Sequence, residues 1–165
     1  MRRAVAALAL ALAGCSSSEL PADQSAKLDP IAFFIGRSHA TAQLDTILGR
    51  PEPVSVDSIG RLGPGGRLIL DQVIRQGHKA PRQRRWLMVP ISGGKYTGSL
   101  TDADGPVTVT VAGPRATIRY RMRNGMSVDQ QLALQRDRRT LLNRLEVSRF
   151  GLRLATLKET IRKVG

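Results

Sequence analysis

The strongest constraint on the fold is an alternation of apolar and polar residues within short segments that are separated by tight turns. Between residues 115 and 123, Ala116, Ile118, Tyr120 and Met122 alternate with arginine and threonine. Successive side chains of a β-strand point to opposite faces, so this period of two predicts a strand with one buried face. No convincing helical period interrupts the segments that follow one another in this way. The sequence therefore predicts an all-β fold.

The same signal recurs along most of the chain. Strands are predicted over residues 54–59, 68–74, 84–91, 95–100, 107–111, 115–123, 128–134 and 141–147, and a final strand is predicted within 155–163. Leu154, Leu157 and Ile161 also fit helical spacing, but a strand that completes the sheet is the preferred interpretation. A short helix is predicted near Asp29–Ile35.

Turn signals set the order of these strands. Asn124-Gly125 lies between two alternating segments and is typical of a two-residue hairpin turn. Short turns between successive strands predict an antiparallel meander of about eight or nine strands. A sheet of that size is expected to close into a barrel of the lipocalin or calycin type, or to curve strongly.

The N-terminus has the pattern of an export signal. Arg2 and Arg3 precede an apolar segment over residues 4–13, and Leu12-Ala13-Gly14-Cys15 resembles the bacterial lipobox. The resemblance implies that Cys15 is acylated after the signal is cleaved. The predicted division is a signal peptide over 1–14, a lipidated cysteine and flexible tether over 15–29, and a barrel domain over 30–165. The alternative is an ordinary signal with an incidental cysteine.

Cys15 also limits the chemistry of the exported protein. It is the single cysteine in 165 residues, so disulfides and thiolate metal sites are not expected. More than one acyl chain on one residue would give stable membrane attachment. Ser16 follows the cysteine, which favours the outer membrane, with the domain facing the periplasm.

The charge favours anionic partners. The net charge is +13, and loss of Arg2 and Arg3 with the signal lowers it to +11. For an exported protein we expect lipid headgroups or lipopolysaccharide phosphates rather than nucleic acid. The candidate contact residues lie mostly on one predicted strand; they are Arg115, Arg119, Arg121, Arg123 and Arg144. A solvated, arginine-rich surface is the alternative.

Residues that would indicate an enzyme are scarce. His39 and His78 have no partner at metal-ligand spacing, and there is no Gly-x-Ser-x-Gly elbow or phosphate-binding loop. The sequence therefore predicts no catalytic residue, no metal and no cofactor. An enzyme of unknown reaction remains an alternative.

Polar residues on the predicted inward stripes point to a ligand cavity instead. A small closed barrel is either filled by its own side chains or holds one small ligand. Buried amides need hydrogen-bond partners, which a ligand could supply. The candidate ligand-binding residues are His39, which is placed at a barrel mouth, and Gln72, Trp86, Tyr120, Gln130 and Asn143. The prediction is non-catalytic binding of a fatty acid, another lipid or a small hydrophobic ligand, by a chain that is assumed to be a monomer.

Several short motifs resemble one known family. They are Phe33-Phe34-Ile35-Gly36-Arg37, Leu68-Ile69-Leu70-Asp71-Gln72, Arg85-Trp86, Gly94-Lys95-Tyr96-Thr97-Gly98 and Ser148-Arg149-Phe150-Gly151. Together they resemble the proteobacterial lipoprotein family catalogued as domain of unknown function 3833. The resemblance implies a lipocalin-like barrel and an envelope location, and it implies no reaction.

Overall fold

A computed structural model describes residues 19–165 of the chain; the predicted signal peptide and Cys15 lie outside the described residues. Ten antiparallel strands follow a short helix, α1 (Pro30–Phe34). The strands are β1 (Gly36–Thr46), β2 (Glu52–Leu62), β3 (Leu68–Gln76), β4 (Arg82–Pro90), β5 (Lys95–Leu100), β6 (Val107–Ala112), β7 (Arg115–Arg121), β8 (Ser127–Leu134), β9 (Thr140–Arg149) and β10 (Leu152–Val164). A 3₁₀ turn over Pro64–Gly66 links β2 to β3.

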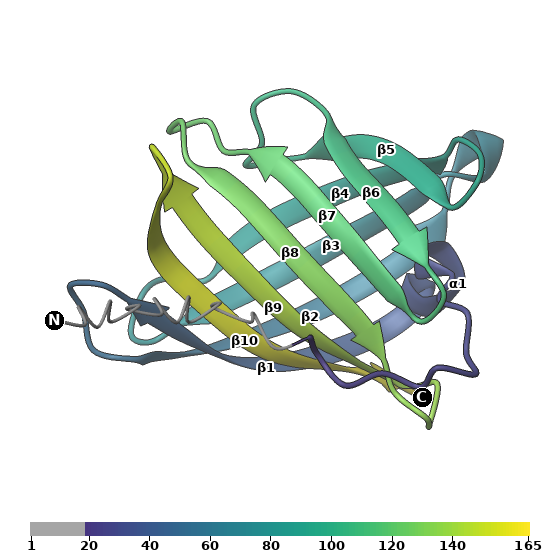
Figure 1. Ribbon diagram of the computed structural model, residues 1–165, viewed down its shortest axis with the longest axis horizontal. Coiled ribbons are helices and arrows are strands. Elements are labelled where there is room, and N and C mark those ends of the chain that lie inside the picture. The colour runs from purple at the N-terminus through teal and green to yellow at the C-terminus, as the bar shows by residue number, and fades with distance from the viewer. Residues whose placement is uncertain (1–18) are drawn as a thin grey trace, which may run out of the picture.

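The strands form one closed barrel. Each strand pairs with its neighbour in sequence, and β1 pairs with β10 from Arg37↔Val164 to Thr46↔Ala155, which closes the sheet. Closure satisfies the backbone hydrogen bonds that an open sheet would leave at its edges. The predicted all-β antiparallel barrel is confirmed, and Figure 1 shows its tilted strands around a single interior.

The strand count differs from the prediction because β1 gave too weak a signal. Its inward stripe begins with Ser38, Ala40 and Ala42, so small and polar side chains replace the large apolar ones that reveal a half-buried strand. The predicted strand in the C-terminal tail is confirmed as β10, and the helix near Asp29–Ile35 is confirmed as α1.

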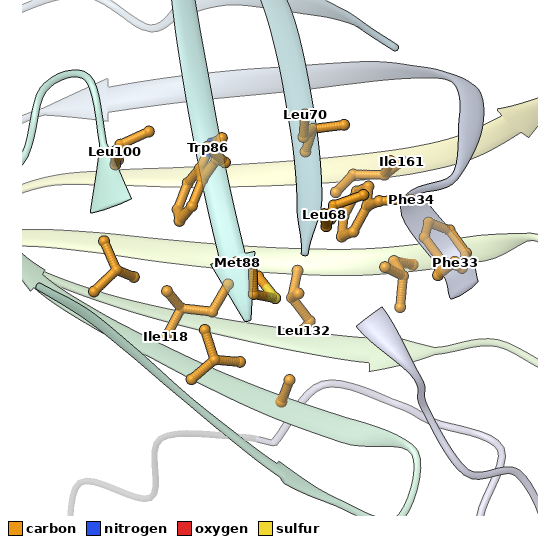
Figure 2. Packing of buried hydrophobic residues seen from close by; sticks show 14 of the residues in the cluster. Phe33, Phe34, Leu68, Leu70, Trp86, Met88, Leu100, Ile118, Leu132 and Ile161 are labelled. Carbon is orange, nitrogen blue, oxygen red and sulfur yellow. The ribbon is translucent and has the colours of Figure 1, made fainter. Parts of the chain in front are cut away.

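Helix α1 closes one end of the barrel (Figure 1). Asp29 caps it, because its Oδ1 accepts hydrogen bonds from the backbone N–H groups of Ile31 (2.9 Å) and Ala32 (3.1 Å). Phe33 and Phe34 are buried beneath it. Figure 2 shows Phe34 beside Leu68 and Ile161, and these three side chains line one small void of about 40 Å³. The α1 end of the interior is therefore a packed core.

The described part of the predicted flexible tether is docked on this end, which corrects the prediction for residues 20–29. The backbone N–H of Leu28 donates to the Gly113 carbonyl (2.9 Å), and that of Asp23 donates to the Leu134 carbonyl (2.9 Å). Ala26 and Leu28 are buried. These two apolar side chains, set among polar residues, fix the segment to the barrel.

Candidate functional site

The half of the barrel away from α1 is hollow. A cavity of about 440 Å³ extends to the end formed by the turns at residues 47–51, 77–81, 101–106, 122–126 and 150–151. Among residues 19–165, no helix covers that end in Figure 1, and we call it the mouth. Most of the lining is apolar; it includes Val54, Val56, Ile74, Val128, Leu145 and Leu157. A cavity of this size falls within the range of small-molecule sites, which span roughly 300–1,000 Å³.

A layer of polar side chains separates the cavity from the packed core. Its first part is built on Gln72 of β3. The Gln72 Oε1 accepts from the Trp86 indole Nε1 (2.8 Å) and from the Arg84 Nε (3.1 Å), and its Nε2 donates to the Ser58 hydroxyl (3.1 Å). Gln72 is paired directly with Ser58 of β2 and with Arg84 of β4 in the sheet register. Two neighbouring strands thus hold this amide in one orientation.

The second part of the layer comes from β9 and β10, which lie on the other side of the β1–β10 seam. The Asn143 Nδ2 donates to the Glu159 Oε2 (2.6 Å), and the two residues are direct partners between β9 and β10. Burial raises the pKa of the Glu159 carboxyl above its ordinary value of 4.5, while the hydrogen bond from Asn143 and the charge of Arg84 oppose that shift. Burial thus favours the neutral form of Glu159.

Arg84 is the cation of this layer. Its guanidinium lies 5.6 Å from the centre of the Trp86 ring, and Trp86 meets Tyr120 edge to face at 5.9 Å. Burial lowers the pKa of Arg84, and it raises the pKa of the Tyr120 hydroxyl. Within residues 19–165, the Arg84 side chain forms a hydrogen bond with only one other side chain, that of Gln72, and it donates this bond from Nε. The terminal guanidinium nitrogens remain as donors at the inner end of the cavity.

Three buried side-chain oxygens lack hydrogen-bond partners in the described part of the chain: the Ser38 Oγ, the Gln130 Oε1 and the Asn143 Oδ1. Of these residues, Gln130 and Asn143 line the cavity. A buried polar atom without a partner costs about 1–3 kcal/mol. A water or a ligand with hydroxyl or amide hydrogens would remove that cost. The layer can therefore receive a polar head that both accepts from Arg84 and donates to these amides.

The structure brings together five of the six residues predicted to bind a ligand: Gln72, Trp86, Tyr120, Gln130 and Asn143. Arg84 and Glu159 were missed. Each lies on the inward face of its strand: Arg84 alternates with Trp86 and Met88 on β4. Glu159 likewise lies between Leu157 and Ile161 on β10. This position on an apolar inward stripe is the signal that could have revealed them.

The prediction that His39 lines the mouth is wrong. Ser38 and Ala40 point inward, so the side chain between them points outward. The His39 Nδ1 lies 2.7 Å from Asp57 Oδ1 on the outer surface, near the α1 end. The hydrogen bonds from His39 and Arg75 hold the pKa of Asp57 below its usual value. His39 therefore belongs to a surface ion-pair cluster.

The predicted arginine surface is partly engaged within the protein. Arg115 pairs with Glu19 (3.3 Å) and donates to the Leu20 carbonyl, and Arg119 pairs with Asp129 (2.6 Å). Arg121 and Arg123 are exposed. Arg144 is half-buried on β9. The strand presents fewer free charges than its sequence suggests.

Two further features bear on the class of protein. Residues 19–165 contain no group of three or more His, Cys, Asp or Glu side chains that could hold a metal ion. In the same part of the chain, no helix has the length and hydropathy needed to span a bilayer.

The closed antiparallel barrel, hollow toward one end, has a lipocalin-like fold. The chain belongs to the family described as protein of unknown function, domain of unknown function 3833, whose sequence profile matches residues 9–163. No curated protein matches the sequence.

Solved structures share the fold at low sequence identity. An S-type phycobiliprotein lyase from Guillardia theta superposes with a TM-score of 0.66 at 6% identity, over 82% of this chain and 90% of its own. A protein of unknown function from the DUF3598 family of Nostoc punctiforme gives a TM-score of 0.61 at 15% identity, over 84% of this chain and 50% of its own. These likenesses establish the barrel architecture.

The buried Glu159 leads to a prediction about pH and stability. A carboxyl whose native pKa is raised contributes stability below its unfolded pKa and loses that contribution as the pH rises through the native value. We therefore expect Glu159→Gln to become progressively more stable relative to the wild type as the pH rises from 4 to 8, measured by urea unfolding. The control is Glu146→Gln, which changes the same charge on the outer face. This account would be contradicted if the difference in the free energy of unfolding between the wild type and Glu159→Gln did not vary with pH.

Proposed function

We propose that this protein binds an amphiphilic, lipid-like molecule inside the barrel without transforming it. The apolar part of the ligand fills the cavity, and its oxygen-bearing head meets the polar layer. The observation that carries the proposal is the cavity of about 440 Å³, apolar along most of its lining and ending at the Arg84 guanidinium and two amide oxygens without donors. Few polar groups at the end of an apolar pocket are typical of a site that orients its ligand.

The head group that fits this layer carries negative charge and a hydrogen-bond donor. Arg84 is the cation of the layer, and burial shifts the pKa of the Glu159 carboxyl upward, which works against a second charge beside it. An anionic head accepts from the terminal guanidinium nitrogens, which suit a carboxylate or a phosphate in bidentate geometry. A hydroxyl on the same head would donate to Gln130 or Asn143. A long-chain fatty acid, with or without a hydroxyl, is the simplest probe of this class.

The proposal includes the place where the protein works. We expect Cys15 to carry a lipid anchor that holds a monomeric barrel at the cell envelope, on the outer membrane and facing the periplasm. The support for this is the sequence pattern of residues 1–15 alone. The similar protein from Guillardia theta is named as a lyase, but a likeness at 6% identity concerns the fold.

A substitution that fills the cavity tests the binding proposal. Val147 lines the cavity and is half-buried, so a larger side chain there extends into empty space rather than into the core. We expect Val147→Phe to weaken the binding of a fluorescent long-chain fatty acid about ten-fold or more, since one methylene in an apolar pocket changes affinity by roughly 10–200-fold. Its free energy of unfolding should change by less than about 1 kcal/mol.

The matched control for this experiment is Gln131→Phe. Gln131 is exposed on β8 and points away from the interior, so the same aromatic ring is added outside the barrel. The control should bind the fatty acid as the wild type does. Full affinity in Val147→Phe would exclude the cavity as the site.

A further inference from the structure

Four large apolar side chains are exposed on two neighbouring turns at the mouth. Ile47 and Leu48 follow β1 and are 65% and 95% exposed, and Phe150 and Leu152 at the β9–β10 turn are 91% and 69% exposed. The two turns meet at their base, where the Ile47 N–H donates to the Leu154 carbonyl (3.1 Å). Single exposed apolar residues are ordinary, but a cluster of this kind marks an interaction surface. We call these four residues the apolar rim.

The backbone at the tip of the rim is unusual. Phe150 has φ 51°, in the left-handed region that bulky residues rarely adopt, and Gly151 follows with φ 77°. Two consecutive positive φ values form the tight turn that joins β9 to β10. Asparagine or glycine would suit the first position better. The sequence instead places an aromatic ring at the apex of the turn, where it is almost fully exposed.

Unpaired positive charge borders the rim. Arg50 lies in the β1–β2 turn, and the Arg149 guanidinium lies 5.2 Å from the centre of the Phe150 ring. Neither arginine forms an ion pair with another residue in the range 19–165. Protruding apolar tips beside basic residues fit a bilayer with anionic lipid, because the tips enter the acyl region and the charges stay at the headgroups.

The rim is continuous with the cavity lining. Leu44 and Thr46 line the cavity directly before Ile47, and Leu154 lines it two residues after Leu152. An apolar molecule could therefore pass from a bilayer into the barrel along apolar surface, without crossing water. We propose that the apolar rim inserts into the surface of an anionic bilayer and places the mouth of the cavity against the lipid. The transfer of a ligand through this contact rests on the proposed function, whereas the contact itself does not.

The contact can be tested in the full chain with a tryptophan at each end of the barrel. Phe150→Trp places the reporter at the rim, and Ile91→Trp places it at an exposed site (62%) in the β4–β5 turn, on the α1 end. Vesicles of phosphatidylcholine and phosphatidylglycerol with brominated acyl chains quench a tryptophan that enters the bilayer. The wild type, whose single tryptophan is the buried Trp86, provides the background.

We expect quenching of Phe150→Trp and none of Ile91→Trp. Adding Arg50→Gln and Arg149→Gln to Phe150→Trp should weaken insertion about five-fold for each charge removed, which corresponds to about 1 kcal/mol per basic residue. Equal quenching at the two ends, or none at the rim, would overturn the proposal. A blue shift of Phe150→Trp that grows with protein concentration without vesicles would also overturn it, because it would assign the rim to contact with a second copy.

A second readout separates this inference from the proposed function. Leu48→Glu/Phe150→Glu should bind a fatty acid supplied from solution as the wild type does, while its uptake from vesicles should slow about ten-fold or more. If the wild type binds no fatty acid from solution, the proposed function fails while the rim quenching still decides the contact. If the variant takes up fatty acid from vesicles at the wild-type rate, a role for the rim in transfer is overturned.

Discussion

Gly60→Ala is expected to lower the free energy of unfolding by about 3 kcal/mol or more, because the added methyl group would collide with backbone atoms. Gly60 lies on β2 beneath the end of α1. A Cβ at this position would stand 1.8 Å from the Phe34 carbonyl oxygen and 2.8 Å from its carbon. Both atoms belong to the backbone, so the clash cannot be relieved by a side-chain rotation. Either α1 lifts from the barrel or β2 moves away from β1.

The control for this prediction is Gly49→Ala. There the added Cβ meets the Thr46 hydroxyl at 2.5 Å, a side-chain atom that can rotate away. Both substitutions remove the same conformational freedom from the unfolded chain, so this contribution cancels when the two variants are compared. Urea unfolding followed by the fluorescence of Trp86 measures both. An equal change in the two variants would mean that α1 is not held against Gly60.

Most of the fold could be predicted because most strands carry a local alternation of apolar and polar residues. The alternation of Ala116, Ile118 and Tyr120 defines both the strand and its buried face. β1 was not predicted, since the tightly packed side of that strand is made by Ser38, Ala40 and Ala42. Small residues satisfy the packing without creating a hydrophobic pattern. The strand that pairs with β10 to close the barrel therefore had the weakest signal.

The site could be predicted only where polarity interrupted an apolar stripe. Gln130 and Asn143 were found for that reason, and both line the cavity. Arg84 was not predicted because Arg82 and Arg85 lie close to it in the sequence, so that the segment resembles an exposed, charged stretch. The one sign that Arg84 points inward is its spacing of two residues from Trp86. The pairing of Asn143 with Glu159 depends on the register between β9 and β10. The effect of the Arg84 charge on the pKa of Glu159, across the barrel interior, arises from closure and is not encoded in any local pattern.

Arg84→Met is expected to change which ligands the barrel accepts, and this is the largest effect that we expect on binding. Methionine retains much of the apolar stem of arginine and removes the charge, so the cavity keeps its shape. A hydrogen bond to a charged group contributes about 1.5–3 kcal/mol, so a long-chain fatty acid should bind about 10–100-fold more weakly. The corresponding fatty alcohol has no charge to lose and should bind within a few-fold of its wild-type affinity. Equilibrium titrations of both ligands measure the difference.

Arg85→Met is the matched control, because Arg85 is the next residue on β4 and points outward. Its guanidinium pairs with Asp71 on the surface, so the same charge is lost from the opposite face of the sheet. This variant should keep the wild-type ratio of fatty acid to fatty alcohol affinity. If Arg84→Met and Arg85→Met weaken fatty acid binding equally, long-range charge rather than a contact in the cavity governs affinity. If neither changes it, the head of the ligand does not reach the polar layer, and the apolar lining alone would have to account for binding.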